Sequence, residues 1–173
     1  RGVTAVVCDP HEIANVLGEA GVRAVIEDAT NTPLKARFTV PSSVPASRLQ
    51  DAGAALDAAA VASLLDLDPV VALGEVMDVP GLVAGDDEIH AKIAAARERG
   101  LTVDGHMAGI DGSALHEAAR YLDTDHESIT LAEARRRVDL GVRVYLREGS
   151  SSRNLADLLP LVDSVDTRRL SLC

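Results

Sequence analysis

Aromatic residues are scarce in this sequence of 173 residues, which has one phenylalanine, two tyrosines and no tryptophan. Its core must therefore be built from valine, leucine, isoleucine and alanine. Hydrophobic residues nevertheless make up 47% of the chain and charged residues 25%, which indicates a folded globular protein rather than a disordered one. A core of small aliphatic residues is typical of parallel strands covered by helices on both faces.

Basic residues are also few, with 17 lysines and arginines against 27 acidic residues and a net charge of −10. This balance argues against nucleic acid or an anionic membrane as the main partner. No signal peptide and no apolar run of membrane-spanning length is present. The two cysteines, Cys8 and Cys173, lie at opposite ends and suggest no disulfide framework. We therefore predict a cytoplasmic protein with no membrane partner.

The two ends of the sequence predict a fragment. The chain starts at Arg1, directly before a strand-like segment, and stops at Cys173 inside another. Natural termini are usually surface extensions. Residues 1–173 are long enough for one domain with a real core, and we predict a single partial domain.

Short apolar runs that end at turns predict strands, and these runs alternate with helix-like segments. The predicted strands are 3–8, 36–40, 69–74, 102–104, 122–124, 142–146 and 168–173, and the predicted helices are 13–20, 57–66, 86–99, 112–120, 131–140 and 154–162. An additional strand-like run at 23–27 is expected to extend into a loop rather than to join the main sheet. No Gly-x-Gly-x-x-Gly opens a helix, so the α/β alternation favours a (β/α)8 TIM-like barrel lacking one strand over a Rossmann sheet.

Two histidines each follow a predicted strand, His106 after 102–104 and His126 after 122–124. In a (β/α)8 barrel the carboxyl ends of the strands form the face that carries the chemistry. Histidine is the commonest metal ligand, so these two residues predict a shared metal ion. The alternative is that both are surface histidines on loops.

Six short motifs follow predicted strands in order along the chain. They are DPHEIANV (9–16), PSSVPA (41–46), LGEVM (73–77), DGH (104–106), DHE (125–127) and REGS (147–150). Together, in this order and at these spacings, they resemble the adenine deaminase family of the amidohydrolase superfamily. The resemblance covers essentially the whole chain.

This resemblance implies a metal-dependent barrel that hydrolyses the exocyclic amine of adenine to give hypoxanthine and ammonia in purine salvage. It implies two divalent ions, manganese or iron with zinc as an alternative. Their ligands would include Glu75, as a bridging carboxylate, together with His106 and His126. Adenine would be the small-molecule partner, and a homo-oligomer is compatible with the sequence.

The resemblance also assigns further roles. The residues implied as catalytic are Glu75, His11 and Glu127, and those implied in substrate binding are Arg147, Glu148 and Ser150. Simpler roles remain open for several of them. His11 is also suited to a turn that caps the following helix, Glu75 to the first turn of a helix, and Arg147 and Glu148 to pairing with each other.

Two expected parts of the family's site are missing from this sequence. It contains no His-x-His motif, which the family has at the end of strand 1, and no aspartate follows its last strand. We therefore predict a barrel without strand 1 and without the region after strand 8, and a chain that is nearly inactive by itself. Two alternatives stay open, namely an amidohydrolase for another cyclic amide or amine, and a metal-free barrel remnant acting as an interaction module. The DPHEIAN motif favours the deaminase.

Overall fold

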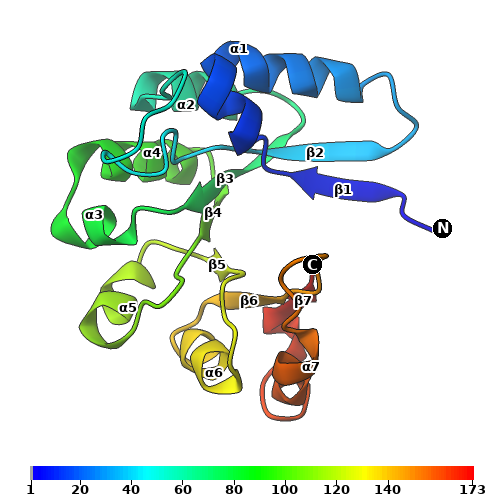
Figure 1. Ribbon diagram of the computed structural model, residues 1–173, viewed down its shortest axis with the longest axis vertical. Helices are drawn as coiled ribbons and strands as arrows, with labels where there is room; N and C mark the ends of the chain where they lie inside the picture. The colour runs from blue at the N-terminus through cyan, green and yellow to red at the C-terminus, as the bar shows by residue number, and fades with distance from the viewer. Residues whose placement is uncertain (1) are drawn as a thin grey trace. The chain divides into compact units, whose positions relative to one another are not determined.

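A computed structural model describes residues 2–173, which form two compact units. Unit 1 is Arg1–Val103 and unit 2 is Asp104–Cys173. Both units alternate parallel strands with helices, as the sequence predicts (Figure 1).

Unit 1 contains three strands that pair in chain order. Its elements are β1 (Ala5–Cys8), α1 (His11–Ala29), β2 (Lys35–Val40), α2 (Ala58–Leu65), β3 (Val70–Val76), α3 (Val79–Ala84) and α4 (Asp87–Glu98). β1 pairs with β2 and β2 with β3, both in parallel. Helix α2 packs on β3 and α4, and its buried side chains include Val61 and Leu64. The carboxyl ends of β1 and β3 therefore point to the same end of one parallel sheet.

Helix α1 corrects one expectation from the sequence. Residues 23–27 are not strand-like but form the second half of this helix. Gly18 adopts φ 60° and ψ −142° inside the helix and kinks it, and the chain then resumes helical geometry. Glycine reaches this positive φ without the steric cost that a Cβ would add, so the helix bends here instead of ending.

Helix α3 is a second difference, because no helix is predicted at 79–84. Its signals are nevertheless present in the sequence. The Asp78 carboxylate accepts a hydrogen bond from Gly81 N at 2.9 Å, Pro80 occupies the first turn, and Gly85 ends the helix in the left-handed conformation.

Unit 2 continues the same pattern. β4 (Thr102–Gly105) starts at the end of unit 1 and is followed by α5 (Gly112–Ala118), β5 (Thr124–Asp125), α6 (Leu131–Asp139), β6 (Arg143–Leu146), α7 (Leu155–Leu158), two short 3-10 helices (Leu159–Asp163 and Thr167–Arg169) and β7 (Leu170–Leu172). β4 through β7 pair in parallel and in chain order. A capping box of Thr130 and Glu133 starts α6.

Aliphatic residues fill both cores, in agreement with the shortage of aromatics. In unit 2 the buried cluster consists of Ala134, Val138, Val144, Leu146, Leu158 and Leu161. In unit 1 the strand β3 is buried along most of its length, with Leu73 and Val76 almost fully inaccessible. Within residues 2–173, every helix is too short or too polar to span a bilayer.

Candidate metal and catalytic site

In unit 1, three side chains of the predicted site meet at the carboxyl ends of β1 and β3. Asp9 and His11 follow β1, and Glu75 lies near the end of β3. His11 Nδ1 lies 3.6 Å from Asp9 Oδ1 and 3.5 Å from Glu75 Oε1. The Asp9 carboxylate is the main cause that raises the pKa of His11 above its ordinary value, against the opposing effect of burial. The structure thus joins two residues predicted as catalytic, His11 and Glu75, with Asp9, to which the sequence assigns no role.

The contact between Asp9 and β3 depends on a glycine. Asp9 Oδ2 accepts a hydrogen bond from Glu75 N at 3.2 Å. A Cβ at position 74 would lie 2.3 Å from that oxygen, which is far inside van der Waals contact. Gly74 therefore lets Asp9 reach the backbone beside Glu75, a close approach that no larger residue permits.

A loop serine and a buried lysine support Glu75 from the other side. The Ser42 hydroxyl donates to the Glu75 carbonyl at 2.7 Å, and Ser43 Oγ accepts from Met77 N at 3.0 Å. Lys92 of α4 in turn donates to the Ser42 carbonyl at 3.0 Å. Burial lowers the pKa of the Lys92 ammonium, with nearby carboxylates, Glu88 first, opposing the effect. The main chain around Glu75 is thus fixed by side chains of two other segments.

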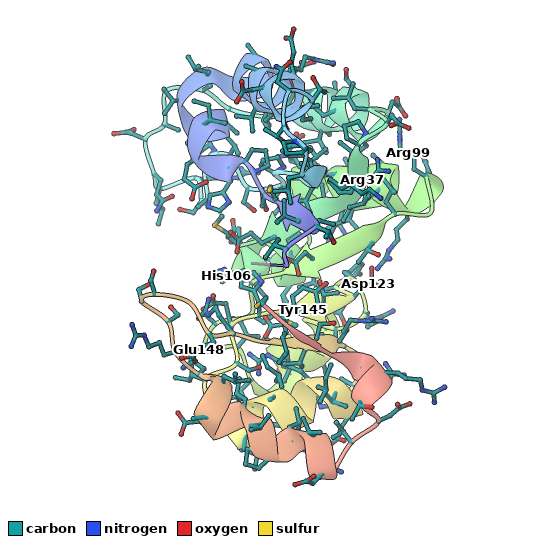
Figure 2. The ribbon with its side chains drawn as sticks, turned by 90° about the vertical axis from the view of Figure 1, so that its right-hand side faces the viewer. Arg37, Arg99, His106, Asp123, Tyr145 and Glu148 are labelled. Carbon is teal, nitrogen blue, oxygen red and sulfur yellow. The ribbon has the colours of Figure 1, made fainter. Side chains whose placement is uncertain are left out.

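In unit 2, the two predicted histidine ligands lie side by side. Their rings are 5.5 Å apart between centroids, with an interplanar angle of 82°. Glu127 Oε1 lies 3.9 Å from His106 Nδ1 and 3.6 Å from His126 Nε2. The other ring nitrogen of His126, Nδ1, lies 3.5 Å from Asp104 Oδ2. Two imidazoles and Glu127, all following β4 or β5, thus lie near Asp104 of β4, as expected for adjacent parallel strands (Figure 2 labels His106).

A buried ion pair holds the backbone that carries these histidines. Arg137 Nε lies 2.9 Å from Asp125 Oδ2, and the two side chains are only 1% and 0% exposed. Asp125 Oδ1 accepts from Met107 N at 2.8 Å, while Arg137 Nη2 donates to the Met107 carbonyl. Met107 follows His106 and Asp125 precedes His126, so one pair fixes the main chain next to both imidazoles.

The predicted substrate-binding residues lie on the loop after β6. Arg147 forms an ion pair with Glu127 of the preceding strand–loop junction, where the sequence analysis also left pairing with Glu148 open. Glu148 Oε2 instead accepts from Leu155 N at 3.3 Å, and Ser150 is exposed. The pairing links Glu127, predicted as catalytic, to Arg147, predicted to bind substrate.

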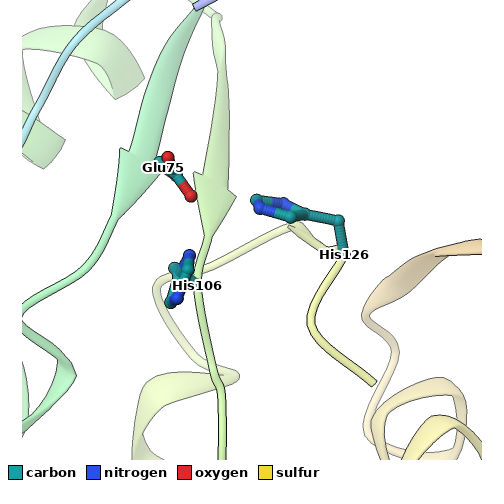
Figure 3. A group of neighbouring side chains, drawn as sticks. All are labelled: Glu75, His106 and His126. Atoms are coloured by element: carbon teal, nitrogen blue, oxygen red, sulfur yellow. The ribbon is translucent and has the colours of Figure 1, made fainter. Parts of the chain in front are cut away.

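Figure 3 draws the three residues predicted as metal ligands. Glu75 comes from β3 in unit 1, and His106 and His126 come directly after β4 and β5 in unit 2. Each thus stands at or beside the carboxyl end of a strand, where the sequence analysis places it. The remaining histidines, His90 and His116, lie in the helices α4 and α5.

Sequence reasoning missed three supporting residues, namely Asp9, Lys92 and Arg137. Asp9 stands in a recognised motif, and its position right after an apolar strand was a usable signal. Lys92 and Arg137 carried no such signal, because cations on amphipathic helices are usually solvent-exposed and Arg137 is one of three consecutive arginines. Only packing distinguishes Arg137, which is buried, from its exposed neighbour Arg136.

Comparison with known proteins establishes the family. The model of the amidohydrolase family matches residues 1–160, and the chain belongs to this family. Its alternation of parallel strands and helices is accordingly that of an α/β protein, an incomplete (β/α)8 barrel of the metal-dependent hydrolase type.

Curated relatives are similar to the whole chain. It is 49% identical over 175 residues to an adenine deaminase of Nitratidesulfovibrio vulgaris strain DP4, with 100% of this chain and 30% of the relative covered. It is 44% identical to the adenine deaminase of Methanosarcina mazei, covering 94% of this chain and 30% of the relative. For the adenine deaminase of Salinibacter ruber the identity is 43%, over 97% of this chain and 31% of the relative. The chain thus spans about 30% of the length of these relatives.

Proposed function

We propose that this chain is the part of an adenine deaminase that supplies its later metal ligands, and that the complete enzyme converts adenine and water into hypoxanthine and ammonia. The observation that carries the proposal is the 49% identity to a curated adenine deaminase over the full length of this chain. The residues at the strand ends support it, because carboxylates and imidazoles follow consecutive strands.

We assign Glu75, His106 and His126 as ligands of divalent metal, with two ions in the complete site and Glu75 as the bridging carboxylate. Their chemistry fits such ions, because imidazole and carboxylate together suit manganese, iron and zinc. We expect manganese or iron, with zinc as an alternative. A divalent metal held there would lower the pKa of a coordinated water and would so supply a nucleophile for C6 of adenine.

The carboxylates of unit 2 orient the two histidines. Asp104, 3.5 Å from His126 Nδ1, favours the tautomer that carries its proton on Nδ1 and leaves Nε2 as the ligand atom. Glu127 lies close to both rings and is held by Arg147. Its carboxylate is suited to accept and return a proton near the reacting carbon, which makes it a catalytic candidate together with His11 and Glu75.

The loop after β6 is the proposed substrate side of unit 2. Arg147, Glu148 and Ser150 supply donors and acceptors of the kind that the polar edge of a purine requires. Arg147 is already oriented by Glu127, so a purine bound there would lie next to a catalytic candidate. In its biological setting we place the enzyme in purine salvage in the cytoplasm, with these residues as part of one barrel domain of a homo-oligomer.

A chimaera tests the proposal directly. These 173 residues would replace the matching segment of the Nitratidesulfovibrio vulgaris enzyme, whose own flanking sequence would supply the rest of the barrel. With manganese added, we expect the chimaera to convert adenine to hypoxanthine, followed by the change in ultraviolet absorbance. The 173-residue chain by itself should show little or no conversion, because it contains no His-x-His motif.

Matched variants separate the alternatives. In the chimaera, Glu75→Gln should abolish conversion, whereas His116→Gln on α5 should leave it unchanged. A folded chimaera that binds manganese but releases no ammonia from adenine would point to another amidohydrolase substrate. A folded chimaera that binds no metal would favour the metal-free remnant.

A further inference from the structure

The cluster of Asp9, His11 and Glu75 in unit 1 has the geometry of a cation site. One atom from each residue, a ring nitrogen or a carboxylate oxygen, lies within 4.8 Å of the other two. His11 Nδ1 is almost equidistant from its two neighbours, at 3.6 Å from Asp9 Oδ1 and 3.5 Å from Glu75 Oε1. The ring nitrogen thus lies at nearly the same distance from both carboxylate oxygens.

These separations match those between ligands of one ion better than those of hydrogen bonds. An N–H donor lies about 2.7–3.2 Å from its acceptor oxygen, so both distances are too long. With metal–ligand distances of about 2.0–2.2 Å, two ligands of a tetrahedral ion lie roughly 3.4 Å apart. The observed spacing leaves room for a cation between the three atoms.

Two of the three atoms are buried without a hydrogen bond. Among the described residues, neither Asp9 Oδ1 nor His11 Nδ1 has a hydrogen-bond partner, although both atoms are inaccessible to solvent. Buried polar atoms without partners are rare, because each costs about 1–3 kcal/mol. The second oxygen of the same carboxylate, Asp9 Oδ2, is already used by Glu75 N. The two atoms face each other at 3.6 Å, an ion-pair distance, and a cation between them would contact both.

We propose that Asp9, His11 and Glu75 bind a divalent transition-metal ion, zinc, iron or manganese, at a site inside unit 1 that is distinct from the one assigned to His106 and His126. A nitrogen ligand with two carboxylates selects these ions over magnesium or calcium, which prefer all-oxygen ligands. The Gly74 contact and the Asp9–Glu75 hydrogen bond preorganise the ligands before the ion arrives.

Nitrogen NMR of the histidines tests the site in the unmodified chain. The 173-residue chain, labelled with nitrogen-15 in its five histidines, would be titrated with zinc, and the His11 signal assigned by its loss in His11→Gln. We expect the Nδ1 resonance of His11 to shift on zinc binding. Zinc that binds while the His11 resonance stays in place would overturn the proposal.

Zinc affinity, measured by competition with a chromophoric chelator, gives the second test. Asp9→Asn keeps an oxygen that accepts from Glu75 N and removes one ligand charge, so the fold should persist. We expect Asp9→Asn and His11→Gln each to weaken one zinc equivalent at least tenfold, and His116→Gln to change nothing. Unchanged zinc affinity in both site variants, with folding verified by circular dichroism, would contradict the site.

His126→Gln distinguishes this site from the one in the proposed function. The inference does not rest on adenine deamination, and no step of the test measures it. In His126→Gln we expect the His11 resonance to respond to zinc as in the unmodified chain. Loss of that response would show that His11 only senses an ion held elsewhere, and the separate site would then be rejected.

Discussion

Asp125 and Arg137 form an ion pair that is almost completely withdrawn from solvent, with Arg137 Nε 2.9 Å from Asp125 Oδ2. Burial raises the pKa of Asp125, and the charge of Arg137 opposes the rise. Because the pair also binds both backbone groups of Met107, its geometry is transmitted to the neighbouring His106. The buried charges therefore tie the stability of unit 2 to the placement of its histidines.

Substitution of Arg137 should be costly. Arg137→Met leaves Asp125 buried without its countercharge, and we expect the free energy of unfolding to fall by about 3–5 kcal/mol. Urea denaturation followed by circular dichroism measures this loss. The control Arg136→Met removes an exposed ion pair with Asp111 and should cost about 1 kcal/mol or less. Equal effects of the two variants would refute the role of the buried pair.

The hydroxyl of Ser42 should contribute to stability through the Glu75 carbonyl. Ser42→Ala removes a buried donor at 2.7 Å, and we expect a loss of about 1–3 kcal/mol in the free energy of unfolding. Ser47→Ala, at a half-buried serine of the same loop that accepts from Leu49 N at 3.3 Å, should change it by about 0.5 kcal/mol or less. If Ser43, 3.4 Å from the same carbonyl, fully replaces the lost donor, the two variants will unfold alike and the prediction fails.

A side chain at position 74 should displace Asp9. Gly74→Ala places a Cβ 2.3 Å from Asp9 Oδ2, and we expect a loss of about 1–3 kcal/mol from this overpacking. The same substitution should weaken zinc binding at Asp9 and His11. A double-mutant cycle with Asp9→Ala isolates the clash, since Gly74→Ala should cost less when the carboxylate is absent. Additive effects would show that the strain arises elsewhere.

Acid should protonate Asp166, whose carboxylate caps the last 3-10 helix of unit 2, Thr167–Arg169. The Arg168 side chain, followed by its backbone N–H, lowers the pKa of Asp166 from 3.8 to about 2. Because the pKa of Asp166 is lower in the folded chain, the ionised carboxylate stabilises the fold at pH values above 3.8. This stabilisation is lost as the pH falls through about 2. Carbon-13 NMR of the carboxyl group should give a midpoint near 2, and Arg168→Gln should raise it. An unshifted midpoint in that variant would contradict the assigned cause.

The parallel strand–helix alternation was predictable from the sequence because it depends on local signals. Apolar runs closed by turns, as at Val70–Val76, identify strands without knowledge of their partners. The first part of α1 was predicted at 13–20, but its continuation through 23–27 was not, because Ala24, Val25 and Ile26 form a short apolar run that also suits a strand. Helix α3 was missed although Asp78, Pro80 and Gly85 mark its two ends.

The candidate site was predictable only in part. Polar residues directly after strands, such as His106 and His126, can be found by position alone, since the carboxyl ends of parallel strands meet. Burial and pairing are properties of the packed chain, so the sequence does not distinguish Arg137 from Arg136. Nor does the sequence reveal that Arg147 forms its ion pair with Glu127, twenty residues away in sequence.

The pairing of strands in chain order, Ala5 with Lys35 in unit 1 and Asp104 with Thr124 in unit 2, has a consequence for synthesis on the ribosome. Each new strand pairs with the strand translated just before it. No strand therefore depends on a distant segment that has yet to leave the ribosome. Pairings of this kind close only short loops, and short loops form early and quickly. Within each unit the polypeptide can thus assemble in the direction in which it is made, with the ligand-bearing strand ends added one at a time.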